Sequence, residues 1–296
     1  MQPLSATALL TGVVDYAGLF PPAALAMPAA VAEFQAALAG ADRWMLGRFV
    51  VPASRLPELA AALIALAATP QDVWPVSAIV RDNSDADLAA ITAFNADGAR
   101  HLARVDAVEA KPLTVDGIDW MASRVGDGID IYVEIAPGSE VDRWLDRVAV
   151  AGLRAKVRTG GVTADAFPSP SLLAGFLAAA VRRGVVFKAT AGLHHALRGD
   201  YRLTYEDGAA VAPMYGYLNV LLATAALRLG RPLETAESIL QSNDATSLVF
   251  SDDEVRWGDQ TFPLSHLRDT RVHHLVSFGS CSFREPADEI GALLSR

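Results

Sequence analysis

Three consecutive segments decide the fold: LRAKVR (Leu153–Arg158), SPSLLAGFLAAAVRRG (Ser169–Gly184) and VVFKAT (Val185–Thr190). The first and third are short, nearly continuous apolar runs, which is typical of strands buried on both faces. Ser169-Pro170 marks the start of a helix between them, and Gly184 marks its end. The stretch therefore predicts a strand–helix–strand unit whose two strands run parallel.

The same unit recurs along most of the chain at the spacing of one βα unit. The other predicted strands are Gly12–Tyr16, Leu46–Val51, Trp74–Val80, Leu102–Glu109, Ile129–Ile135 and Leu275–Phe278. Predicted helices include Leu56–Ala68, Leu88–Phe94, Leu172–Arg183 and Pro286–Leu294. Eight such units predict a single α/β domain over residues 1–296, a (β/α)₈ TIM barrel. A doubly wound open sheet is the alternative, but no G-x-G-x-x-G motif follows the first strand.

The stretch 196–274 is too long for one connection and predicts an insertion between the seventh and eighth strands. It contains two predicted helices and a hairpin: Tyr215–Leu229, Leu233–Gln241 and Ser247–Phe250 with Val255–Trp257. We expect Tyr201–Val211 to lie near the mouth of the barrel and partly cover the active site. We expect the hairpin to lie peripherally or at a subunit contact, which would make the protein a homo-oligomer.

Composition excludes several classes of protein. The chain is 52% hydrophobic and 20% charged, which excludes intrinsic disorder. Its formal charge of −9 and the lack of a basic stripe argue against a nucleic-acid partner. Apolar runs such as Leu59–Ala68 and Leu172–Val181 fall short of the ~20 residues that span a bilayer. With a single cysteine, Cys281, and no basic residue before Arg43, we expect a cytoplasmic protein without a membrane partner.

Lysine is rare in this chain, and its positions are informative. Only Lys111, Lys156 and Lys188 are lysine among the 25 basic residues, and the last two lie inside predicted strands. Burial lowers the pKa of a lysine, and a second ammonium nearby lowers it further. A neutral amine can form a Schiff base with a carbonyl compound. The alternative is a structural ion pair of each lysine with a carboxylate such as Glu109 or Glu134.

Several short motifs resemble those of the deoxyribose-phosphate aldolase family, in the same order along the chain. Lys156-Val-Arg-Thr-Gly160-Gly-Val resembles the sixth-strand motif of that family, and Val186-Phe-Lys188-Ala-Thr-Ala-Gly192 is similar to its seventh-strand motif. Arg104-Val-Asp106-Ala-Val resembles its fourth strand. Shorter similarities occur at Val14–Leu19, Ile131–Glu134 and Phe278–Ser282. Arg158 departs from the family pattern, which has a small hydroxyl residue there, and Ala191-Gly192 replaces a double glycine.

The resemblance implies a class I aldolase-like lyase that acts on a small, possibly phosphorylated carbonyl substrate. Lys156 would form the Schiff base, Lys188 would lower its pKa, and Asp106 would transfer protons. Glu134 and Glu109 are further acid–base candidates. No metal and no organic cofactor would be needed, because the lysine itself is the electron sink. Residues expected to bind the substrate or its phosphate are Arg158, Gly160, Gly192, Gly279, Ser280 and Ser282.

Two other functions remain open at this point. A metal-dependent barrel enzyme would place His195, Glu134 and Glu109 around a divalent ion. A non-catalytic barrel protein would use the insertion for binding or assembly. His194 and His195 are adjacent, so at most one of them is expected to be a ligand, and a hydrogen-bonded histidine in a loop is the simpler interpretation.

Overall fold

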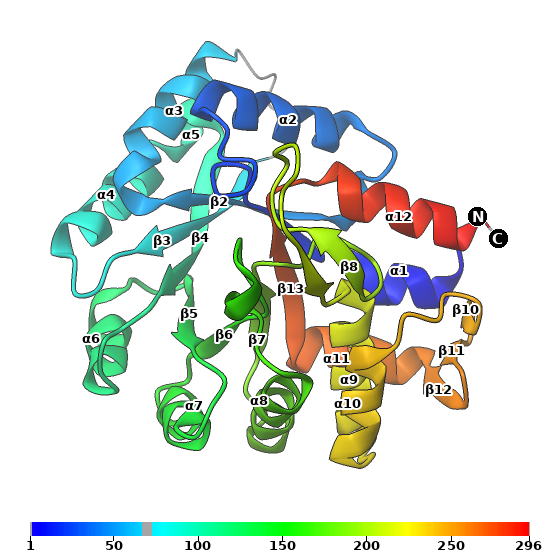
Figure 1. The fold of residues 1–296 in the computed structure, drawn as a ribbon. Coiled ribbons are helices and arrows are strands. Elements are labelled where there is room, and N and C mark those ends of the chain that lie inside the picture. Colours follow the sequence, from blue (N-terminus) through cyan, green and yellow to red (C-terminus); the bar gives the residue numbers. More distant parts are fainter. Residues whose placement is uncertain (1, 67–72, 296) are drawn as a thin grey trace.

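Eight parallel strands close into a barrel in the computed structural model, which describes residues 2–66 and 73–295 (Figure 1). The strand order is β1-β13-β7-β6-β5-β4-β3-β2, so each barrel strand pairs with the next barrel strand in sequence, and β7 pairs with β13 across the insertion. The strands are β1 (Val14–Tyr16), β2 (Leu46–Pro52), β3 (Trp74–Val80), β4 (Ala103–Ala110), β5 (Asp130–Ile135), β6 (Arg154–Arg158), β7 (Phe187–Thr190) and β13 (Leu275–Ser280). The predicted (β/α)₈ barrel is confirmed.

Helices surround the barrel, and Figure 1 shows them as an outer ring. They are α1 (Leu4–Leu10), α2 (Met27–Ala39), α3 (Leu56–Ala65), α4 (Asp85–Ala96), α5 (Gly98–His101), α6 (Asp116–Arg124), α7 (Val141–Val150), α8 (Pro170–Arg183), α9 (Tyr217–Arg228), α10 (Leu233–Gln241), α11 (Leu264–His273) and α12 (Arg284–Leu294). Short 3₁₀ turns lie at Arg43–Met45, Ala53–Arg55 and Ala164–Ala166. The serine before α8 caps it as expected, because the Ser169 hydroxyl accepts a hydrogen bond from the backbone N–H of Leu172. The predicted end of α3 at Ala68 lies outside the described residues.

The segment between β7 and β13 forms three structures. The first is an antiparallel hairpin of β8 (Gly199–Arg202) and β9 (Val211–Met214). The helices α9 and α10 follow, and α9 is buried along most of its length because α8, α10 and α11 pack around it. The last is a sheet of β10 (Leu248–Phe250), β11 (Glu254–Trp257) and β12 (Gln260–Pro263). The predicted hairpin is present, and β12 extends it.

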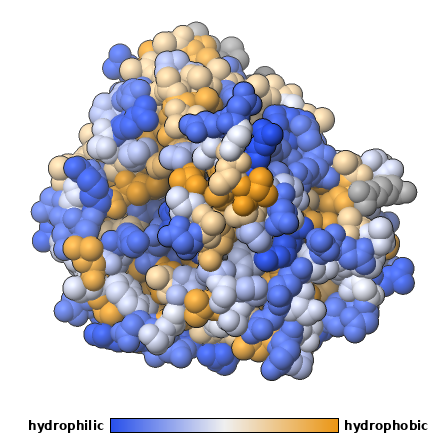
Figure 2. All heavy atoms as spheres, viewed as in Figure 1, coloured by the Kyte–Doolittle hydropathy of each residue, from blue (hydrophilic) through white to orange (hydrophobic). Residues whose placement is uncertain are grey.

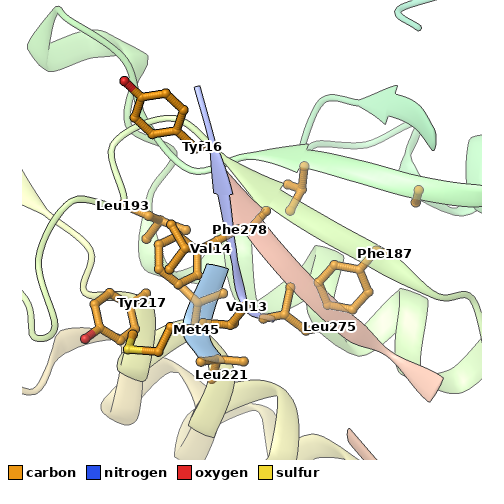
Figure 3. Close-up of a cluster of buried hydrophobic side chains, with 14 of the residues drawn as sticks. Val13, Val14, Tyr16, Met45, Phe187, Leu193, Tyr217, Leu221, Leu275 and Phe278 are labelled. Atoms are coloured by element: carbon orange, nitrogen blue, oxygen red, sulfur yellow. The ribbon is translucent and has the colours of Figure 1, made fainter. Parts of the chain in front are cut away.

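The barrel wall packs on its helices through aromatic and aliphatic side chains. Figure 3 shows one such cluster, in which the outer faces of β1 and β13 meet α9. The rings of Tyr217 and Phe278 are stacked there with centroids 4.7 Å apart. Large buried aromatic surfaces of this kind contribute strongly to stability. The face of the molecule drawn in Figure 2 carries mainly hydrophilic residues, with hydrophobic ones in separate patches.

One outer helix is apolar enough to resemble a membrane span. The stretch Ala164–Arg183 has the length and composition that would suffice to cross a bilayer. In the structure, Leu173, Phe176 and Leu177 of this stretch are fully buried within the protein. Helices that cover a barrel often have this composition, because one face of each packs on the strands.

Candidate active site

A row of polar side chains crosses half of the barrel at one level. Glu134, Lys156, Lys188 and Ser277 are successive register partners on β5, β6, β7 and β13. Register partners of neighbouring parallel strands project from the same face of the sheet. Both strand lysines therefore point into the barrel interior from neighbouring strands.

Lysines and carboxylates alternate along one line in the barrel interior. Lys188 Nζ lies 2.8 Å from Asp15 Oδ2 and 2.5 Å from Glu109 Oε1. Lys156 Nζ lies 3.0 Å from Glu109 Oε2 and 2.8 Å from Glu134 Oε2. The other oxygen of Glu134 lies 3.5 Å from Lys111 Nζ. The line runs from the buried Asp15 to the exposed Lys111 and contains every lysine of the chain.

Hydrogen bonds hold the two most buried carboxylates in place. Ser77 donates to Glu109 Oε1 at 2.8 Å, and Ser277 donates to Asp15 Oδ2 at 2.8 Å. The second oxygen of Asp15 accepts a hydrogen bond from the backbone N–H of Arg48. A side chain at Gly47 would clash with this carboxylate, because its Cβ would lie 2.6 Å from Asp15 Oδ1. The site is therefore positioned by neighbours that are themselves fixed.

The charges control one another's ionisation. Burial lowers the pKa of Lys188, but Asp15 and Glu109 outweigh it, so the net pKa lies above the ordinary value. Burial raises the pKa of Glu109, but Lys188 and Lys156 outweigh it and bring the pKa well below its usual range. For Glu134, Lys156 likewise outweighs burial and the pKa is lowered. The expectation that burial would lower the pKa of a strand lysine therefore does not hold for Lys188.

A pocket of about 230 Å³ opens above the lysines. Lys156, Lys188 and Glu109 line it from the barrel interior, and Arg158 lines it at the carboxyl end of β6. Its other lining residues are Ala17, Phe20, Pro21, Pro22, Val50, Ile79, Gly161, Val162, Thr190, Ala191, Gly192, His194, Gly279 and Cys281. The pocket thus lies at the carboxyl ends of the strands, where barrel enzymes hold their active sites.

Asp106 lies away from this pocket, although it stands on the same strand as Glu109. The register between β3 and β4 shifts by one residue at Asp106. Its carboxylate binds Arg48, with 2.8 Å between Nε and Oδ1, and Arg48 also reaches Asp130 at 3.4 Å. Asp130 begins β5, so this ion-paired group lies toward the amino-terminal end of the barrel, where residues serve stability. Glu109, not Asp106, is the carboxylate of β4 that meets the lysines.

Two of the predicted substrate-binding glycines contact one aromatic ring. A Cβ at Gly160 would lie 2.3 Å from Phe167 Cε1, and a Cβ at Gly192 would lie 2.8 Å from the same atom. Gly192 also has a positive φ of 73°. Close packing with Phe167 and, for Gly192, the backbone conformation explain why these positions are glycine.

The loop after β13 is bonded within the protein. Ser280 Oγ lies 3.4 Å from His194 Nδ1, and Ser282 Oγ accepts a hydrogen bond from the N–H of Glu285 in the first turn of α12. The Glu285 carboxylate lies 3.6 Å from His194 Nδ1. Burial, with the nearby His195, lowers the pKa of His194 to about 4, so its ring is neutral at pH 7. Gly279 of this loop lines the pocket.

His195 faces away from the lysines. Its ring stacks on Tyr201 with centroids 3.4 Å apart, and its Nδ1 lies 2.6 Å from Glu289. The structure therefore does not bring it together with Glu134 and Glu109, which bind Lys156. Nearby, the hydroxyl of Tyr205 lies 3.4 Å from Sγ of Cys281, a pocket-lining residue. The Tyr201–Val211 segment thus reaches the rim of the pocket.

The sheet of β10–β12 lies near the amino terminus, on α1. The backbone N–H of Leu4 donates to Asp252, and that of Ser5 donates to the carbonyl of Ser251. Both acceptors belong to the turn between β10 and β11. This sheet does not contribute to the pocket lining and is peripheral to the barrel, as expected for the hairpin.

Sequence reasoning missed two members of the charged line, Asp15 and Lys111, as parts of the site. Asp15 was visible as an acidic residue in the first predicted strand, and its fully buried carboxylate now pairs with Lys188. Lys111 follows β4 directly, at the carboxyl end of the barrel. The scarcity of lysine was the available signal for it, since all three lysines meet at one site.

Comparison with protein families finds no family that matches this chain, and comparison with curated proteins finds no significant match. The barrel architecture itself rests on the strand pairing described above.

Proposed function

We propose that this protein is a class I aldolase-like lyase that forms a Schiff base between Lys156 and a small carbonyl compound. The single observation that carries the proposal is the placement of Lys156 at the wall of a pocket, between two carboxylates, of which Glu134 can exchange its proton. The resemblance of the sixth- and seventh-strand motifs to deoxyribose-phosphate aldolases supports the same chemistry.

The free energy needed to bury so many charged groups argues for a catalytic role of this arrangement. Removing charged groups from water costs several kcal/mol for each ion, and apolar side chains of similar volume are often as stable or more so. Five charged groups (Asp15, Glu109, Glu134, Lys156 and Lys188) are almost fully removed from water here. Strongly coupled charges in a cleft are typical of active sites.

Each residue has a separate role in the proposed reaction. Lys156 transfers its proton to Glu134 and attacks the carbonyl carbon with the freed electron pair. The carbinolamine oxygen takes one proton from its own nitrogen and one from Glu134 and leaves as water, which gives an iminium ion on Lys156 and an ionised Glu134. Glu134 then takes the proton of a hydroxyl group on Cβ, the Cα–Cβ bond breaks, and the Cβ fragment leaves as an aldehyde. The electron pair of that bond moves into the iminium to form an enamine. Glu134 returns the proton to Cα of the enamine, and water hydrolyses the resulting iminium to release the second product.

The remaining charged groups keep these roles distinct. Lys188 holds Glu109 in its ionised form, so Glu109 stabilises the positive charge of the iminium rather than accepting a proton. Lys111 binds the second oxygen of Glu134 at the exposed end of the line. Proton exchange with solvent can therefore take place at Glu134, the least buried of the three carboxylates.

Borohydride trapping tests the proposal. The protein is incubated with short aldehydes, ketones and oxo acids, reduced with borohydride, and its intact mass is measured. We expect one adduct whose mass is that of the carbonyl compound less one oxygen atom, and we expect Lys156→Met to remove it. The matched control is the same chain unfolded in guanidinium, which presents the same amines without a pocket. Equal labelling of the folded and unfolded chains would contradict the proposal.

A further inference from the structure

Arg158 is a cation at the pocket that makes no ion pair with a described carboxylate, although its charge helps to lower the pKa of Glu134. Most arginines of the protein bind an Asp or Glu, as Arg48, Arg154 and Arg183 do. Arg158 is exposed, lines the pocket, and stands two residues after Lys156 on the same strand. Residues i and i+2 of a strand project from the same face, with Cα atoms ~6.6 Å apart. The guanidinium and the Lys156 amine are therefore spaced so that one short molecule could contact both.

The loop between β13 and α12, two strands away from Arg158 in the barrel, is unfavourable for a doubly charged anion. The N-terminal turn of α12 would attract a phosphate through its free N–H groups. Here the Ser282 hydroxyl accepts a hydrogen bond from one of these N–H groups, and the Glu285 carboxylate lies in the same turn beside His194. His194 carries no charge at pH 7 because burial lowers its pKa to about 4. Glu285 would repel a phosphate at this point.

The rest of the pocket is small and mainly apolar. Its volume of about 230 Å³ lies below the ~300–1,000 Å³ of typical ligand pockets, which suits a short molecule. Phe20, Pro21 and Pro22 after β1, with Val50 and Ile79 from the next two strands, provide an apolar wall. A sugar hydroxyl that faces this apolar wall would lose hydration without gaining a hydrogen bond.

We infer that the substrate is a short oxo acid, whose carbonyl meets Lys156 and whose carboxylate is bound by Arg158. This inference rests on the proposed function, because it names the substrate class of that same site. A planar guanidinium binds a carboxylate through two parallel hydrogen bonds. A single negative charge and a short apolar chain match the one free cation of the described pocket lining and its apolar wall.

Borohydride trapping with pairs of ligands, each an oxo acid and a neutral ketone of similar shape, tests the inference. Pyruvate and methyl isopropyl ketone have the same shape but differ in charge, as do levulinate and methyl isoamyl ketone. We expect the wild-type protein to be half-saturated by the acid at a concentration about tenfold lower than by its ketone. Arg158→Gln should remove this preference, whereas Arg182→Gln, a change of an exposed arginine on α8, should keep it. An equal preference in Arg158→Gln and wild type would overturn the inference, as would tighter binding of glycolaldehyde phosphate than of either oxo acid.

A binding measurement separates this inference from the proposed function. Butyrate has no carbonyl group that could react, so calorimetry with butyrate and butyramide reports on Arg158 alone. Butyrate binding that depends on Arg158, without any trapped adduct, would support the oxo-acid site and contradict the Schiff base. Trapping of neutral ketones with no binding of butyrate would support the Schiff base and overturn the role of Arg158.

Discussion

Lys156 and Lys188 are register partners on neighbouring strands, and their ammonium groups bind different oxygens of one carboxylate, that of Glu109. The two lysines differ in access, because the Lys188 side chain is 1% exposed and the Lys156 side chain is 7% exposed. Lys188 is therefore a fixed positive charge inside the barrel, and Lys156 is the amine that a ligand can reach.

This difference predicts unequal effects on stability. Lys188→Met leaves the buried Asp15 without a lysine partner, which should lower the free energy of unfolding by about 3–5 kcal/mol. Lys156→Met should cost less, about 1–2 kcal/mol, because Glu109 keeps Lys188 and Glu134 keeps Lys111. Denaturant unfolding measures both values. Equal losses would show that the two lysines play the same structural role.

Glu134→Gln should slow adduct formation on Lys156 about 100-fold, because the amide cannot accept the lysine proton. The measurement is the rate of borohydride-trapped adduct over time at saturating ligand. Glu140→Gln is the control, since this glutamate lies on the same side of the barrel in the exposed turn before α7 and pairs only with Arg143 among the described residues. A rate for Glu134→Gln like that of the control would assign proton transfer to another group.

Asp106 and Glu109 give a direct comparison of the two carboxylates of β4. Asp106→Asn weakens the pairing with Arg48 and should cost about 1–2 kcal/mol of stability while adducts still form. Glu109→Gln removes the charge between the two ammonium groups and should reduce adduct formation by at least about tenfold. Borohydride trapping and denaturant unfolding of both variants show which of the two carboxylates serves the reaction and which serves stability. Loss of the adduct in Asp106→Asn alone would return the catalytic role to that residue.

The free energy of unfolding should begin to fall with decreasing pH before the pH range in which carboxylates titrate is reached. Burial, as the main cause, lowers the pKa of both His194 and His274 to about 4 from an ordinary value of 6.5. Between pH 6.5 and 4 the unfolded chain binds protons that the folded chain does not, so stability falls as pH falls through that window. Each histidine contributes up to about 3 kcal/mol.

Unfolding in denaturant at several pH values tests this slope. His274→Gln should flatten it by about half, whereas His266→Gln, at a partly exposed site on α11, should not. A slope that is unchanged in His274→Gln would contradict the assignment.

Much of the fold could be predicted because its strands carry a local signal. The segment Trp74–Val80 was predicted with the bounds it has, since a continuous apolar run is enough to mark a buried strand. The third strand of the peripheral sheet, β12, was missed. It contains only Phe262 as a large apolar side chain, and its pairing with β11 makes it a strand. Tertiary pairing of this kind leaves little trace in the sequence.

The site could be predicted only in part, for a similar reason. Both strand lysines were recognised, because a lysine inside an apolar strand is unusual. Asp106 was expected beside them because its motif resembles the fourth strand of the aldolase family, and the register shift at this residue cannot be read from the sequence. Such irregularities re-aim side chains, and here Glu109 is brought to the lysines instead. The ion pairs themselves depend on which strands become neighbours, which only the closed barrel fixes.

Peptide mapping of the reduced adduct tests the central claim most directly. The chain offers only three lysines and its amino terminus as amines, so the modified residue can be assigned by fragmentation without ambiguity. After incubation with a trapped oxo acid and reduction with borohydride, the account predicts a modification on Lys156 at one equivalent and none on Lys188. Modification of Lys111 or the amino terminus in place of Lys156, or no modification with any carbonyl compound, would contradict it.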